Sequence, residues 1–178
     1  VRGAAAAGRA RSGSSGLQVA VATIDGLVYL VNSDGSLEGT WRWPNSSESA
    51  PFQPLILNTA GGRAVLTATE SGLIHAWNAD GEPVAGFPFQ HSGRIAFAPV
   101  AGDLNGDGLM ELVVVGSDGT ITAYSLQAAG SEPDRWTMPL GDRSNSGTPG
   151  GASLPVATVG SIESRQSGDV TVPYSVQG

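Results

Sequence analysis

Short apolar runs alternate with glycine-containing turns along most of the chain. Three ten-residue segments, 17–26, 63–72 and 110–119, align without gaps and each ends in a glycine. Their first residues lie 46 and 47 positions apart. A second apolar run follows each segment, over 27–31, 73–77 and 120–124. Two such runs around an Asp-Gly or Ser-Gly turn predict a β-hairpin, so we expect three similar hairpins.

The pattern continues beyond the first two hairpins. An Asn-x-Asp-Gly turn at 32–35 recurs at 78–81 and predicts a third strand after it. A fourth stretch, over 52–57 and 95–100, leads to the next hairpin. Each unit therefore holds four short strands in roughly 46 residues, the size of a β-propeller blade. No run keeps helical spacing for more than about one turn, so we expect almost no helix.

The second strand of each hairpin alternates, as a blade strand should. One side carries Val28, Leu30, Ile74, Ala76, Ile121 and Ala123. Tyr29, His75 and Thr122 take equivalent places on the other side, which favours a packing role for His75.

Composition excludes several classes of function. The chain has 178 residues and a net charge of −7, and all nine of its basic residues are Arg. An acidic chain without basic clusters argues against nucleic acid as a partner. There is no Cys, which excludes disulfides and thiolate chemistry, and the two His are too few for a His-rich zinc site. The longest aliphatic runs fall far short of the ~20 residues of a membrane span. Residues 1–7 do not match a signal peptide. The sequence also lacks an initiator Met, so we expect a processed chain or a piece of a longer one.

One loop carries recognisable chemistry. It has oxygen-bearing side chains at its positions 1, 3, 5 and 9, namely Asp103, Asn105, Asp107 and Glu111, with Gly106 and Gly108 between them. Alternate residues of a curling loop can converge on one point, and the Leu109 carbonyl can add a further oxygen. Ca²⁺ takes six to eight oxygen ligands in proteins. We therefore predict one Ca²⁺ site at Asp103, Asn105, Asp107, Leu109 and Glu111; an Asx-type turn without metal is the alternative.

This loop and the strand after it resemble the calcium loop of FG-GAP/VCBS repeats, the blades of integrin-α-like β-propellers found in bacterial surface and secreted proteins. The family pattern Asp-x-Asn/Asp-x-Asp-Gly-x-x-Asp/Glu is met at every position of 103–111. The stretches 25–29, 78–81 and 86–88 are similar to other blade motifs of such proteins, and 135–142 to their closing segment, with Thr137 in place of the usual Pro. The stretches before Leu17 and Arg63 lack acidic residues, so a single calcium site is expected.

These patterns together predict an all-β fold of about three β-propeller-like blades, each of four antiparallel strands, as part of a larger propeller. The units are 1–16 (a degenerate loop or the end of a preceding blade), 17–62, 63–109 and 110–140 (blades, the second ending in the calcium loop), 141–153 (a linker) and 154–178 (a tail or the start of an immunoglobulin-like β-sandwich module). The sandwich rests on 167–176, which is similar to the opening strand of such modules.

The resemblance implies a non-enzymatic module outside the cell, at its surface or in the periplasm, because a weak calcium site would stay empty in the cytosol. Its expected partner is a protein, a glycan or another chain that completes the propeller. Alternatives are a structural subunit of a surface assembly and a propeller enzyme of the quinoprotein type. The enzyme is disfavoured because the four Trp do not recur at one blade position and no Ser-His-Asp ordering is found.

Overall fold

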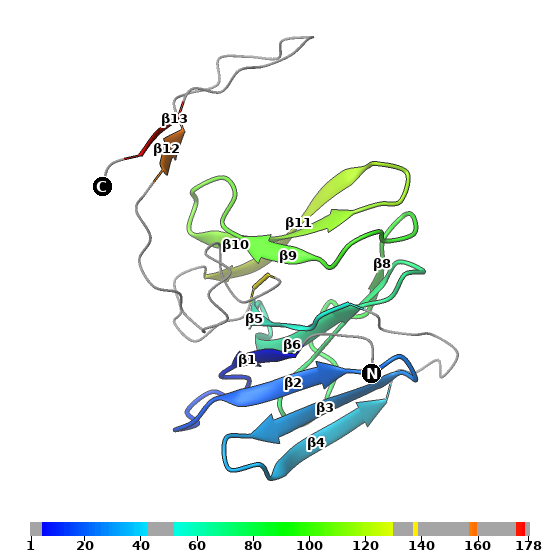
Figure 1. Cartoon of the computed structure of the whole chain (residues 1–178), viewed down its shortest axis with the longest axis vertical. Helices are drawn as coiled ribbons and strands as arrows, with labels where there is room; N and C mark the ends of the chain where they lie inside the picture. Colours follow the sequence, from blue (N-terminus) through cyan, green and yellow to red (C-terminus); the bar gives the residue numbers. More distant parts are fainter. Residues whose placement is uncertain (1–4, 43–51, 130–136, 139–156, 160–173, 177–178) are drawn as a thin grey trace.

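The computed structural model describes residues 5–42, 52–129, 137–138, 157–159 and 174–176, and these contain strands and turns but no helix (Figure 1). This confirms the all-β prediction. None of the described segments forms a helix long and apolar enough to cross a membrane. The predicted linker over 141–153 lies outside the described residues.

The strands form antiparallel sheets in which neighbours in sequence are neighbours in space. The first sheet has the order β1 (Ala6–Gly8), β2 (Gln18–Ala22), β3 (Leu27–Asn32) and β4 (Leu37–Arg42). The second has the order β5 (Leu55–Thr59), β6 (Gly62–Ala68), β7 (Leu73–Trp77) and β8 (Phe89–Gln90). The third contains β9 (Val100–Gly102), β10 (Leu109–Val115) and β11 (Ile121–Ala129), with β10 in the middle. None of these sheets closes on itself.

Two further strands pair outside this stack. β12 (Ala157–Val159) runs antiparallel to β13 (Tyr174–Val176). β13 falls within 167–176, where the sequence predicts a strand. The residues that would show a β-sandwich lie outside the described ones.

The three predicted hairpins are present, at β2–β3, β6–β7 and β10–β11. Their turns make the same pair of backbone hydrogen bonds. The amides of Thr23, Thr69 and Gly116 donate to the carbonyls of Leu27, Leu73 and Thr120, and those of Gly26, Gly72 and Gly119 donate back to Thr23, Thr69 and Gly116. In each sheet a short strand before the hairpin pairs with its first strand, so β1, β5 and β9 open the sheets.

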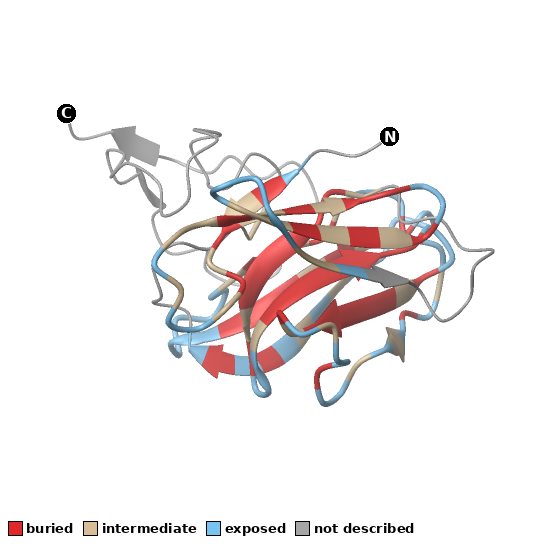
Figure 2. Cartoon of the chain, turned by 90° about the horizontal axis from the view of Figure 1, so that it is seen from below, coloured by how far each residue is buried: buried red, intermediate tan, exposed pale blue. Residues whose placement is uncertain are grey.

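The second sheet lies between the other two (Figure 1). Buried residues run through the middle of the stack (Figure 2). One apolar cluster joins the first and second sheets through residues such as Leu30 and Val65, and another joins the second and third through residues such as Leu66 and Leu112. The alternation predicted along the second strands follows this layering: Val28 and Ile74 are fully buried. The middle sheet is therefore buried on both faces, while each outer sheet has one face away from the stack.

Candidate metal centre

The acidic loop joins two neighbouring strands of the third sheet. β9 ends at Gly102 and β10 begins at Leu109, and the backbones of Gly102 and Glu111 lie opposite each other. Residues 103–109 are exposed, whereas Glu111 is only 8% exposed. The loop is thus an open turn whose closing carboxylate is anchored on a strand.

Asp103 organises the first half of the loop. Its Oδ1 accepts a hydrogen bond from the Gly106 amide at 2.7 Å, and its Oδ2 accepts one from the Gly108 amide at 2.9 Å. Gly106 and Gly108 have φ of 79° and 84°, a region that L side chains rarely adopt. The glycines let the chain curl so that two amides point at one carboxylate.

Asn105 and Asp107 organise the second half. The Asp107 amide donates to Asn105 Oδ1 at 2.9 Å, and the Asn105 side-chain amide donates to Asp107 Oδ2 at 3.0 Å. Asp107 Oδ1 accepts from the Leu109 amide at 2.7 Å. The two side chains predicted to be neighbouring ligands are therefore in direct contact.

Glu111 closes the loop from β10. Its Oε2 accepts a hydrogen bond from the Leu104 amide at 3.0 Å, across seven positions of the chain. A largely buried carboxylate usually needs such partners, because its charge is costly away from water. This contact fixes the width of the loop at its base.

The structure ties every predicted side-chain ligand into this one loop, but it does not gather three carboxylates around a point. Among the residues that the structure describes, no group of three or more His, Cys, Asp and Glu side chains could hold a metal ion. The hydrogen bonds are of the Asx type, as the metal-free alternative expects. They do not exhaust the oxygens, since an ionised carboxylate has about four acceptor positions and each bond from an amide uses one. The donor set of carboxylate and amide oxygens fits Ca²⁺.

A second loop, 10–18, occupies the corresponding place in the first sheet. Gly13 aligns with Gly106 and has nearly the same φ, 78° against 79°. Gln18 aligns with Glu111, and its Oε1 accepts hydrogen bonds from the amides of Ala10 at 2.9 Å and Arg11 at 3.5 Å. A neutral side chain here closes the loop in the way that Glu111 closes the acidic one.

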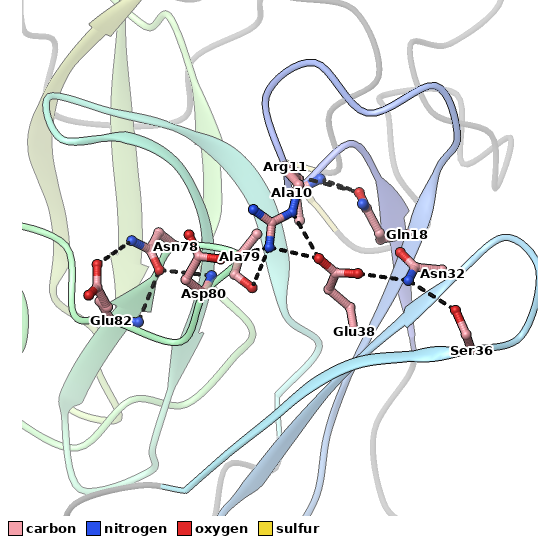
Figure 3. A network of polar contacts seen from close by, with 10 residues as sticks. All are labelled: Ala10, Arg11, Gln18, Asn32, Ser36, Glu38, Asn78, Ala79, Asp80 and Glu82. Atoms are coloured by element: carbon pink, nitrogen blue, oxygen red, sulfur yellow. Dashed lines mark hydrogen bonds and ion pairs between the residues drawn. The ribbon is translucent and has the colours of Figure 1, made fainter.

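Arg11 is the cation of this second loop (Figure 3). Its guanidinium donates to Glu38 Oε1 at 2.8 Å and to Asp80 Oδ1 at 2.7 Å, and so joins the first sheet to the turn after β7. Hydrogen bonds from Asn32 and Arg11 lower the pKa of Glu38. The sequence could not predict these partners of Arg11, because Glu38 and Asp80 are distant from it in the chain.

His91 is a second feature that the sequence left without a role. It is 1% exposed, and its Nδ1 lies 2.8 Å from the Tyr124 hydroxyl. Tyr124 also contacts Phe89, which contacts Phe87, with ring centroids 4.8 and 5.4 Å apart. This row of rings packs between the second and third sheets. No local motif could have revealed it, because His91 and Tyr124 are distant in sequence.

Two adjoining recesses lie near the end of β11. One, of about 370 Å³, has polar lining residues that include Ser12, Asn58 and Arg63. The other, of about 290 Å³, includes the rings of Phe87, Phe89 and Tyr124 in its lining. Thr59, Ala60 and Gln127 line both recesses. Aromatic rings beside polar groups are the usual lining of a binding site.

No protein-family model matches this chain, and no curated protein is detectably similar to it. Its function is therefore inferred from its own residues.

Proposed function

We propose that this chain is a non-enzymatic, calcium-stabilised module of the β-propeller type, in a protein that acts outside the cell or at its surface. The acidic loop carries this proposal. It combines a motif that resembles the FG-GAP/VCBS calcium loop with a backbone that already curls around its acidic side chains.

The ligands of the Ca²⁺ would be the side chains of Asp103, Asn105, Asp107 and Glu111 and the carbonyl of Leu109. Water would complete the shell. Ca²⁺ is favoured over Mg²⁺, which is smaller, demands near-ideal octahedral geometry and dehydrates reluctantly. The ion would cancel repulsion among acidic groups in a short turn. Its role would be to fix the connection between β9 and β10.

The environment follows from the strength of such a site. Exposed calcium loops of extracellular modules bind with dissociation constants of about 10⁻⁴–10⁻³ M. The loop here is exposed over 103–109. A site of this strength would be filled in calcium-rich surroundings and empty in cytosol.

The second recess near the end of β11 is the place where a protein or glycan would bind in this proposal. Its lining combines the rings of Phe87, Phe89 and Tyr124 with the polar groups of Thr59 and Gln127. The histidines support a non-enzymatic module, because both are engaged in packing. His75 stacks on Trp77 at 5.1 Å between ring centroids, and His91 contacts Tyr124.

Thermal melts in calcium and in chelator test the proposal. With free calcium 100-fold above the dissociation constant, we expect the folded state to gain about 2.7 kcal/mol. Asp107→Ala should remove most of this gain, whereas Asp25→Ala, in a turn of the first sheet, should keep it. Equal melting temperatures with and without calcium in the folded wild-type protein would reduce the loop to an Asx turn.

A further inference from the structure

The three sheets stack with a constant polarity. The forward face of a sheet is defined here as the one toward the next sheet in chain order. In the first sheet it carries Ala20, Ala22, Val28 and Leu30. The residues 46 positions later, Leu66, Ala68, Ile74 and Ala76, form the forward face of the second sheet and pack on the third.

The backward faces correspond in the same way. Val65 and Trp77 of the second sheet pack on the first sheet. The residues 47 positions later, Leu112 and Tyr124, pack on the second sheet. Both interfaces therefore join a forward face to a backward face at equivalent positions. The chain forms the same head-to-tail interface twice.

The third sheet exposes an apolar forward face. Val113 and Val115 are half-buried, and Ile121 is 73% exposed. The counterparts of Ile121 in the other sheets, Val28 and Ile74, are 0% exposed. This face thus carries residues of the type that is buried in both existing interfaces.

Among the residues that the structure describes, none packs over the matching backward face of the first sheet. Val19, Val21, Tyr29 and Val31 are half-buried there. The counterparts of Val19, which are Val65 and Leu112, are fully buried. Leu37, opposite Val31 on the neighbouring strand, is 57% exposed. Within the described residues, the stack of sheets therefore ends in one forward face and one backward face of the repeated interface, and neither face is paired.

We propose that a second copy of this chain covers both faces. The forward face of the third sheet in each copy packs on the backward face of the first sheet in the other, so that two equal contacts close a ring. A head-to-tail contact closes into a ring or runs on as a filament, depending on the rotation between copies. Counted over the stacked sheets that the structure describes, two copies supply six, within the four to eight of known propellers, whereas three copies would supply nine. This inference rests on the propeller-type stacking of the proposed function but not on its calcium site.

Sedimentation equilibrium of the full chain at micromolar concentration tests the pairing. We expect twice the chain mass of 18.0 kDa. A single-chain mass throughout the concentration range would overturn the proposal, and so would an open-ended series of larger species.

Substitutions on the two faces test the head-to-tail arrangement. Ile121→Glu alters the forward face and Leu37→Glu the backward face, and both side chains are exposed, so the single chain should keep its fold. Because each contact uses one face of each kind, either variant damages both contacts of its own pair. We expect each variant to be a monomer at concentrations where the wild type pairs. Its affinity for itself should fall at least about 100-fold, because pairing would bury an unpaired charge.

A mixture of the two variants separates this arrangement from other dimers. The Ile121→Glu chain keeps an intact backward face and the Leu37→Glu chain an intact forward face, so together they should form one good contact and a 1:1 pair. A dimer held by two forward faces would survive Leu37→Glu, and that result would overturn the proposal. The matched control is Ile24→Glu. Ile24 lies in a turn outside both faces and is 47% exposed, so this variant should pair like the wild type.

Calcium melts of the same samples keep the two proposals distinguishable. A monomeric wild type with an undiminished calcium effect would overturn the ring and leave the calcium site standing. A stable pair with no calcium effect would overturn the calcium site and leave the ring standing.

Discussion

Loops 10–18 and 103–111 have the same length and a similar backbone, but they meet opposite surroundings. Both curl at a glycine with positive φ and both are closed by a side-chain oxygen from the following strand. The position of Asp103 is taken by Ala10 in the first loop, and Ala10 is 1% exposed in an apolar cluster. A carboxylate is tolerated in the third sheet because that loop is open to water.

The difference also extends to how each loop connects to its neighbours. The first loop sends Arg11 to the acidic side chains Glu38 and Asp80, and so carries its own cation. The acidic loop has no basic side chain between 103 and 111. The negative charge near two loops of the same shape is thus neutralised in different ways. The guanidinium of Arg11 does this at the first loop and, in our proposal, a bound ion does it at the acidic loop.

The largest expected effect comes from placing a carboxylate in the first loop. Ala10→Asp should lower the free energy of unfolding by about 3 kcal/mol, because the charge would enter a buried apolar site. Urea denaturation measures the change. Ser12→Asn, at an exposed position of the same loop, should stay within about 0.5 kcal/mol of wild type. An Ala10→Asp protein of unchanged stability would mean that the two loops differ less than their burial indicates.

Acidification tests the stability of the stacked sheets to which both loops belong. Burial lowers the pKa of His75 to about 4, and the side chain is 3% exposed. An unfolded His titrates near 6.5, so the unfolded chain binds more protons between these values. Keeping His75 neutral therefore contributes up to about 3 kcal/mol to the free energy of unfolding. This stabilisation is fully present above pH 6.5 and is lost as the pH falls toward 4.

Melts from pH 7 to 4 in chelator check this expectation. His75→Thr is the control, since Thr122 holds the equivalent place in the third sheet. The variant should lose part of the pH dependence. An unchanged profile would show that other groups cause the acid sensitivity.

Exchanging the predicted ligand side chains tests the calcium proposal. In the loop-exchanged variant, Asp103→Ala, Asn105→Ser, Asp107→Ser and Glu111→Gln place the residues of the first loop at these four positions of the acidic loop. We expect them to abolish the calcium-dependent stabilisation, about 2.7 kcal/mol at 100-fold excess over the dissociation constant. Differential scanning calorimetry with calcium and with chelator compares the two proteins. A calcium shift that survives the exchange would place the ion elsewhere.

The smallest expected effect concerns the cation of the first loop. Arg11→Met removes both ion pairs while keeping much of the apolar stem. Because these pairs are partly exposed, we expect a small decrease in melting temperature that disappears in about 1 M salt. An equal decrease at low and high salt would show that Arg11 acts by packing.

The hairpins and the acidic loop could be predicted because each depends on local pattern. Alternation places Val28 and Tyr29 on opposite faces of their strand whatever the rest of the chain does, and the turn sequences fix where the strands reverse. β1 could not be predicted, because Ala6–Gly8 contains no residue that favours strands. It forms against the open edge of β2, which supplies the backbone partners.

Contacts between residues distant in sequence could not be predicted either. Arg11 reaches Asp80 across 69 positions, and His91 reaches Tyr124 across 33. These pairs meet because the sheets stack, and their residue types follow no spacing rule. The sequence can therefore predict the acidic loop but not the side chains that hold neighbouring sheets together.

The number of calcium ions bound per chain tests the central claim most directly. Equilibrium dialysis of the wild-type protein against calcium, beside the loop-exchanged variant, measures it. We predict one ion per wild-type chain and none in the variant. No bound ion in the folded wild-type protein, or an equal number in both proteins, would contradict the calcium-stabilised module.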